Sequence, residues 1–179
     1  MGFEEKSLPP SPLLSVRSEV IVNAPPEKVW NNVVTFSELP PADDWLFDLG
    51  IACPTCATIE GTGVGAIRYC NFTTGPFVEP ITVWDEPNVL AFDVTKQPAP
   101  MKELSPYDIH PPHLDGHLQS KRGEFRLERI DGDRTRLTGT TWYKHNMWPS
   151  IYWKIWSDFL IGRIHTRVLQ HVKNLSEER

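Results

Sequence analysis

The sequence predicts an α+β fold in which a curved antiparallel β-sheet packs against one long C-terminal helix. Two observations lead to this prediction. Between residues 57 and 143, short segments of strand character are separated by tight turns, which favours a meander over parallel βαβ units. From residue 150 to 175, apolar residues recur every three or four positions, which is typical of an amphipathic helix of about seven turns.

The N-terminal elements are shorter. Residues 1–14 contain three prolines and few apolar side chains, so we expect a loosely ordered arm followed by a single domain over 15–179. Residues 16–22 alternate in polarity and predict a strand. The following NAPPE segment resembles the first turn of a helix, which we expect to include Phe36 and to end at Pro40. A second short helix within 43–56 is an open alternative.

The predicted strands of the middle region share β-branched or aromatic residues between turn signals. They cover residues 66–72, 79–84, 89–95, 118–129 and 135–143. One connection differs from the rest, because residues 97–116 form a long proline-rich loop. A loop of this length is unusual in a compact domain and is either functional or mobile, and our candidate role for it is a lid or an entrance.

Composition excludes several classes of protein. The chain has 179 residues and a net charge of −5 with no basic run, which argues against a nucleic-acid partner. Its longest stretch without a charged residue is residues 49–59, whereas a membrane span needs about 20 residues, so we expect no membrane span. Three cysteines without a visible secretory signal favour a reducing compartment, and we predict a cytoplasmic protein.

Local sequence adds a resemblance to a known superfamily. The segments that carry it are residues 18–30 (SEVIVNAPPEKVW), 61–68 (GTGVGAIR), 81–87 (ITVWDEP), 90–94 (LAFDV), 134–138 (RTRLT) and 164–169 (IHTRVL). In this order the chain resembles the START-like superfamily (SRPBCC group), specifically its polyketide cyclase/dehydrase and lipid-transport branch.

That resemblance implies the helix-grip fold, in which the curved sheet wraps around the long C-terminal helix and short helices follow the first strand. It also implies an apolar cavity between sheet and helix that takes a lipid, a polyketide or another hydrophobic small molecule. The superfamily has no universal catalytic triad, so no catalytic residue is carried over, and fold alone does not fix function.

Three motifs have competing interpretations. His110, His113 and His117 have ligand chemistry, but the prolines at 111 and 112 hold them in an extended segment, which favours a solvent-facing loop over a metal site. The CPTC sequence at 53–56 has redox spacing, and we interpret it as chance spacing of small buried thiols. The glycines of residues 61–65 lack the context of a dinucleotide site, and we expect no cofactor and no metal.

Candidate ligand contacts combine polar groups with aromatic and apolar walls. We select Arg68, Tyr69, Trp84, Phe92, Phe125, Tyr143, Ile164, His165, Val168 and His171. For Arg68 two interpretations stay open, a carboxylate partner on the outer face of the sheet or an acidic group of a ligand. On a helical wheel His171 lies near the middle of the apolar arc and His165 at its edge.

Three functional hypotheses follow. The first is binding, with possible transport, of a hydrophobic or amphipathic small molecule in the cavity. The second is a cyclase-, aromatase- or dehydratase-like enzyme that uses a cavity His or Tyr as general acid or base, and it requires titratable side chains that converge in one pocket. The third is a protein- or membrane-interaction module over the Trp-rich residues 142–156, and it requires a broad exposed apolar patch.

Overall fold

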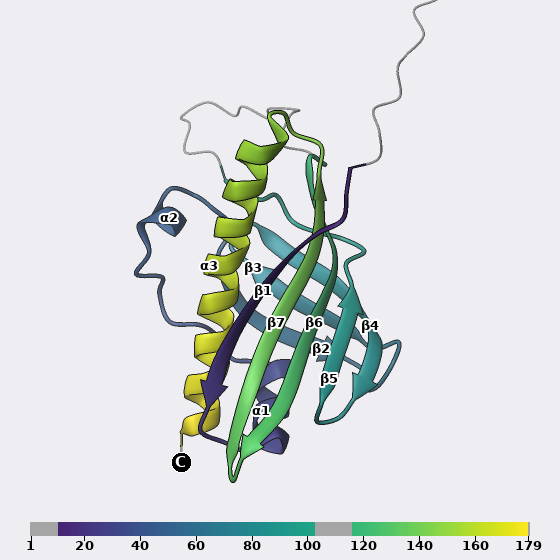
Figure 1. Cartoon of the computed structure of the whole chain (residues 1–179), viewed down its shortest axis with the longest axis vertical. Coiled ribbons are helices and arrows are strands. Elements are labelled where there is room, and N and C mark those ends of the chain that lie inside the picture. Colours follow the sequence, from purple (N-terminus) through teal and green to yellow (C-terminus); the bar gives the residue numbers. More distant parts are fainter. Residues whose placement is uncertain (1–10, 103–115, 179) are drawn as a thin grey trace, which may run out of the picture.

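The computed structural model describes residues 11–102 and 116–178, which form a curved sheet around a long helix (Figure 1). The elements in chain order are β1 (Leu14–Val22), α1 (Pro26–Val34), α2 (Trp45–Asp48), β2 (Pro54–Glu60), β3 (Ile67–Phe72), β4 (Gly75–Asp85), β5 (Val89–Asp93), β6 (Leu118–Asp131), β7 (Arg134–His145) and α3 (Ser150–Glu177).

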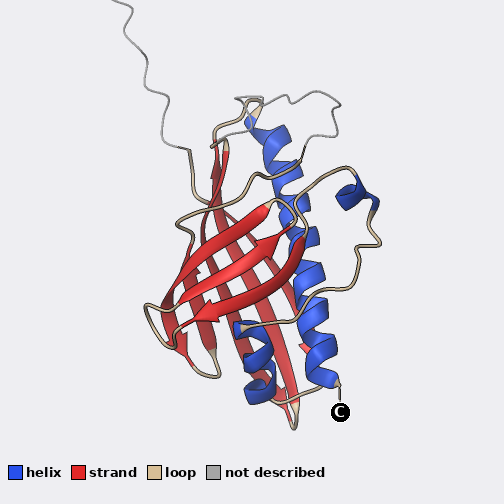
Figure 2. Ribbon diagram, turned by 180° about the vertical axis from the view of Figure 1, so that it is seen from behind, coloured by secondary structure: helices blue, strands red, loops and turns tan. Residues whose placement is uncertain are grey.

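The sheet has seven strands in the order β1-β7-β6-β5-β4-β3-β2, and each neighbouring pair is antiparallel. Apart from the β1–β7 pair, every neighbour is also the next strand along the chain. Turns of two or three residues join β3 to β4, β4 to β5 and β6 to β7, whereas β5 and β6 are joined by the long segment after Asp93. Seen from behind, β2, β3 and β4 curl forward beside α3 (Figure 2). The predicted α+β arrangement of a curved antiparallel sheet around a C-terminal helix is confirmed.

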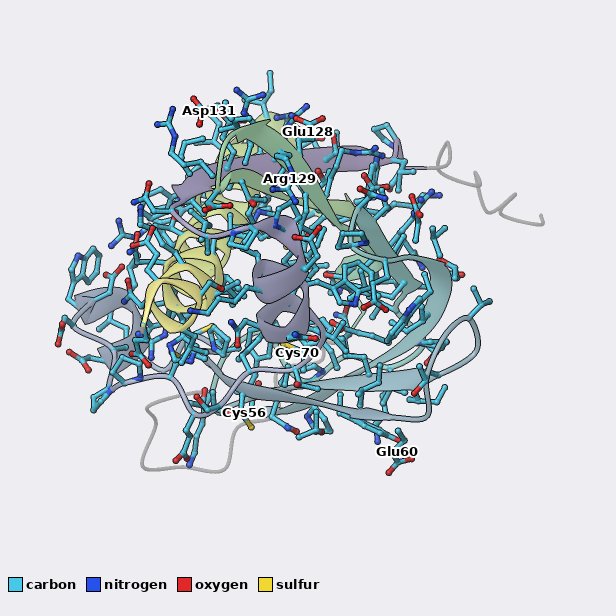
Figure 3. All side chains as sticks on the ribbon, turned by 90° about the horizontal axis from the view of Figure 1, so that it is seen from below. Cys56, Glu60, Cys70, Glu128, Arg129 and Asp131 are labelled. Atoms are coloured by element: carbon cyan, nitrogen blue, oxygen red, sulfur yellow. The ribbon has the colours of Figure 1, made fainter. Side chains whose placement is uncertain are left out.

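The first helix is shorter than predicted. Helix α1 begins at Pro26 and buries Val29, Trp30 and Val33. It ends at Val34 because the backbone of Phe36 instead pairs with Ala57 of β2 through two hydrogen bonds of 3.1 Å. The prediction that the helix includes Phe36 is therefore wrong. Viewed from below, α1 lies beside α3 inside the curve of the sheet (Figure 3).

Helix α3 has two different halves. Its C-terminal half buries Val168, Leu169 and Val172 against the sheet and α1. In the N-terminal half, Trp156 is 40 % exposed, although its spacing placed it in the buried stripe. A spacing of three or four residues shows that apolar side chains share one face of the helix. Burial of that face also requires another element packed against it, and among the described residues no element covers Trp156 fully.

Two predicted segments fall largely where the structure is not described. The predicted arm, residues 1–14, lies outside the described residues up to position 10, and β1 already begins at Leu14. Of the predicted lid, residues 103–115 are likewise outside. Within 11–102 and 116–178, no helix combines the length and the apolar character needed to cross a membrane.

Candidate functional site

A partly open cavity of about 120 Å³ lies between the concave face of the sheet and α3. Its aromatic walls are Phe72, Phe77, Phe92 and Phe125, and α3 closes it with Ile161, Ile164, His165, Val168 and Leu169. Pockets for drug-sized ligands measure roughly 300–1,000 Å³, whereas an engineered cavity of about 150 Å³ binds benzene. The cavity therefore has the size of a single aromatic ring.

A buried ion pair forms the polar part of the cavity wall. Arg68 of β3 and Glu79 of β4 are 1 % and 5 % exposed, and Arg68 donates through Nη1 to Glu79 Oε2. Its Nε donates to Val34 O at 3.1 Å and its Nη2 to Val33 O at 3.4 Å. These two carbonyls belong to the last turn of α1, which has no continuing helix to occupy them. The pair thus ties α1 to the sheet.

Aromatic rings enclose the Arg68 guanidinium. Its Cζ lies 5.6, 5.5 and 5.6 Å from the ring centroids of Phe36, Phe92 and Phe125. Burial lowers the pKa of Arg68, but its acidic neighbours, Glu79 above all, outweigh that effect and the pKa is raised. Burial raises the pKa of Glu79, and Arg68 opposes that rise. We describe the two as an ion pair, because a charged guanidinium at hydrogen-bond distance favours the carboxylate.

The thiols near the cavity are not activated. Cys70 is buried in the cavity wall, and burial raises the pKa of its thiol to about 12. Figure 3 places Cys70 on the inner side of the sheet and Cys56 on the outer side. The reactive thiol of a redox motif normally lies at the start of a helix. Cys56 lies in strand β2 instead.

His165 of α3 lines the cavity between two hydroxyl groups. Its Nε2 lies 2.7 Å from Thr141 Oγ1 on β7, and its Nδ1 lies 3.2 Å from Ser18 Oγ on β1. A hydroxyl donates or accepts as required, so both nitrogens of a neutral imidazole are satisfied. Burial lowers the pKa of His165 to about 4. The ring is therefore neutral at pH 7 and joins α3 to two strands.

Stability is expected to fall as the pH drops from about 6.5 to about 4, because His165 gains a proton only in the unfolded chain over this range. The lowered pKa of His165 predicts that the free energy of unfolding is smaller by roughly 2–3 kcal/mol near pH 4 than at pH 7. The measurement is urea unfolding at pH 4.5, 5.5 and 7. The His165→Gln variant should lose this part of the pH dependence and His171→Gln should keep it; equal slopes in all three proteins contradict the prediction.

Comparison with known proteins shows similarity of structure and none of sequence. No protein-family model and no curated protein matches the chain. A truncated norcoclaurine synthase from Thalictrum flavum superimposes with a TM-score of 0.59 at 14% identity, over 97% of this chain and 99% of that chain. The Zhui aromatase/cyclase from Streptomyces sp. R1128 gives 0.56 at 15% identity, over 92% and 94%. The chain has the helix-grip fold of these structures.

Norcoclaurine synthase from Thalictrum flavum has also been solved in complex with dopamine and hydroxybenzaldehyde. That structure superimposes with a TM-score of 0.57 at 14% identity, over 94% of this chain and 90% of that chain. At such identity the similarity concerns the helix-grip fold alone. The cavity of this chain lies between the curved sheet and α3, which is the position that the resemblance implied.

The structure brings six of the ten predicted contact residues of the helix-grip domain to the cavity. They are Arg68, Phe92, Phe125, Ile164, His165 and Val168. Arg68 does have a carboxylate partner, but Glu79 lies on the inner face of the sheet and not on the outer face that the first interpretation expected. A binding role for these six stays a prediction.

Two predicted contacts on strands lie away from the cavity. The Tyr69 hydroxyl donates to Glu60 at 3.3 Å, because strand alternation turns Tyr69 away from the face that carries Arg68. The ring of Trp84 instead packs edge-on against Trp30 of α1 at 5.5 Å. Neither borders the cavity.

Tyr143 and His171 also lie outside the cavity lining. Tyr143 is fully buried and donates to Asp158 Oδ1 at 2.6 Å, and burial together with this carboxylate raises its pKa. His171 lies against Phe36 and bonds Ser37 O at 3.1 Å, because the segment after α1 covers that part of α3. The helical wheel placed His171 nearer than His165 to the middle of the apolar arc, but His165 is the histidine that borders the cavity.

Sequence reasoning missed Glu79 and the glycines of the cavity wall. A two-residue turn at Thr73 and Thr74 would have paired Arg68 with Glu79, which is the observed register. Gly123 lies opposite Phe92, and a Cβ there would lie 2.4 Å from the Phe92 ring. The ring occupies the space over this glycine, a packing relation that local sequence does not reveal.

The N-terminal half of α3, together with Trp148 just before the helix, exposes an apolar face, which we call the α3 outer face. Its members are Trp148 (88 % exposed), Ile151 (76 %), Tyr152 (51 %), Ile155 (66 %), Trp156 (40 %) and Phe159 (46 %). This is the kind of patch that the interaction-module hypothesis required, although Trp142 is not part of it and stacks on Arg122 at 5.1 Å. An interaction role stays a prediction.

The histidine cluster cannot be assembled from the described residues. His110 and His113 lie outside them. His117 is described, and its Nδ1 lies 2.6 Å from Asn146 Oδ1 at the start of the segment between β7 and α3.

Proposed function

We propose that this protein binds a small hydrophobic molecule of single-ring size in the cavity between the sheet and α3. The observation that carries the proposal is a cavity of about 120 Å³ with four phenylalanines and the apolar residues of α3 as walls, and with few polar groups. The two ligands in the norcoclaurine synthase complex, which shares the fold, are also single-ring molecules. A long lipid or a fused-ring polyketide needs more volume.

Cyclase-like catalysis has weaker support. A general acid and a general base need a free proton donor or acceptor within reach of one bound molecule. In the described lining, both nitrogens of His165 are occupied by hydroxyls, and Arg68 keeps its proton. Glu79 is the ionisable side chain of the described lining that is left to accept a proton or a hydrogen bond. A single acceptor is enough to bind a donor group of a ligand, but it does not provide both the general acid and the general base.

The test uses toluene as a probe of the proposed site. Toluene at ten times its dissociation constant is expected to raise the free energy of unfolding by about 1.4 kcal/mol, because it binds only the folded chain. Urea unfolding with and without toluene measures this, and a methyl-proton NMR titration gives the affinity.

Two matched substitutions on one helix locate the site. Ile161→Phe should fill the cavity and weaken toluene binding at least tenfold, whereas Ile155→Phe changes a 66 % exposed residue and should leave it unchanged. Absence of toluene binding to the wild-type chain, or equal weakening by both substitutions, would overturn the proposal.

A further inference from the structure

The ion pair in the cavity wall restricts the charge of a bound molecule. Among the described residues, Arg68 and Glu79 are the charged side chains that border the cavity, and their charges cancel. Arg122 and Glu124 border the cavity only through the backbone of β6, because their side chains pair at 3.5 Å on the outer face of the sheet, where Arg122 stacks on Trp142. An anion has to compete with Glu79 for Arg68, and a cation that reaches Glu79 lies next to the like charge of the Arg68 guanidinium. A charge without a partner is costly to bury, so the lining favours a neutral molecule.

The guanidinium has little capacity left for a ligand. Three of its nitrogens already donate, to Glu79, Val33 and Val34. Phenylalanine rings lie around it, so a ligand reaches rings before it reaches an N–H group. Arg68 therefore acts as the counterion of Glu79 and as an anchor for α1, and not as an anion receptor.

Glu79, in contrast, has acceptor capacity to spare. An ionised carboxylate accepts roughly four hydrogen bonds. Among the described residues only Arg68 donates to Glu79, through Oε2, while Glu79 borders the cavity. A donor on a bound molecule would find a charge-assisted acceptor there, which is worth about twice a neutral one.

We propose that the ligand is an uncharged, single-ring-sized molecule with one O–H or N–H group that donates to Glu79. This inference rests on the proposed function, because it assigns the chemistry of the molecule in that same cavity. The rings of Phe92 and Phe125 would flank its apolar body, and the carboxylate would fix its polar end.

The experiment compares four probes of similar size, toluene, phenol, benzoate and benzylammonium, by NMR or calorimetric titration at pH 7. Phenol is expected to bind at least fivefold more tightly than toluene, and at least tenfold more tightly than either ion. In the double variant Arg68→Met/Glu79→Leu, which removes the acceptor without leaving a lone buried charge, the phenol preference should disappear.

The matched control is Arg129→Met/Glu27→Leu, which removes an exposed ion pair of 2.9 Å between α1 and β6 and should keep the phenol preference. If toluene binds as tightly as phenol, or an ion binds more tightly, the ligand assignment is wrong and the proposed function stands. If neither neutral probe binds, the proposed function itself fails.

Discussion

Replacing Glu79 by alanine is expected to lower the free energy of unfolding by about 3–5 kcal/mol, because it leaves the Arg68 guanidinium charged and unpaired in the interior. Such a loss is a large share of the roughly 5–15 kcal/mol that stabilises a typical domain. Guanidinium chloride unfolding, followed by circular dichroism, measures it.

Removing both partners should cost much less than removing one. The Arg68→Met/Glu79→Leu chain keeps the volume of the site and loses the stranded charge, so we expect it to be more stable than Glu79→Ala alone. As a control, Glu27→Ala breaks the exposed pair with Arg129 and should cost less than about 1 kcal/mol. A Glu79→Ala cost as small as that of Glu27→Ala would show that water reaches the Arg68 guanidinium.

The elements of this fold were predictable because their signals are local. The β-branched and aromatic residues of 135–143 and the spacing of apolar residues in 150–175 are local features of the chain, and the corresponding β7 and α3 were found within two residues at each end. The end of α1 was not predictable in this way. Phe36 leaves the helix to pair with Ala57, a partner that only the assembled sheet provides.

The candidate site was predicted only in part, because some of its residues have local signals and others depend on the assembled fold. Arg68 and His165 were selected as polar groups on elements of known period, and both border the cavity. Glu79 was missed because its importance depends on the register of β3 and β4, and the turn that sets this register was not recognised. His171 was misplaced because a helical wheel gives direction but does not show which segment covers it.

Replacing Phe92, which lines the cavity, by alanine is expected to lengthen the cavity enough to admit a two-ring molecule and to cost about 3–5 kcal/mol of stability. Its ring, 7 % exposed, packs over Gly123 and lies 6.1 Å from the ring of Phe125. Removing it joins this space to the cavity that Phe92 already borders. Fluorescence titration with 1-naphthol, together with urea unfolding, measures both effects.

Two comparisons separate cavity length from general loosening. Phe36→Ala removes a ring that is 4 % exposed but absent from the cavity lining, so it should cost similar stability without raising 1-naphthol affinity. Gly123→Ala should cost about 1–3 kcal/mol alone through overpacking against Phe92, and much less in the Phe92→Ala background. If 1-naphthol binds the wild-type chain as tightly as the Phe92→Ala variant, Phe92 does not limit the cavity. The space over Gly123 would then be separate from the binding site.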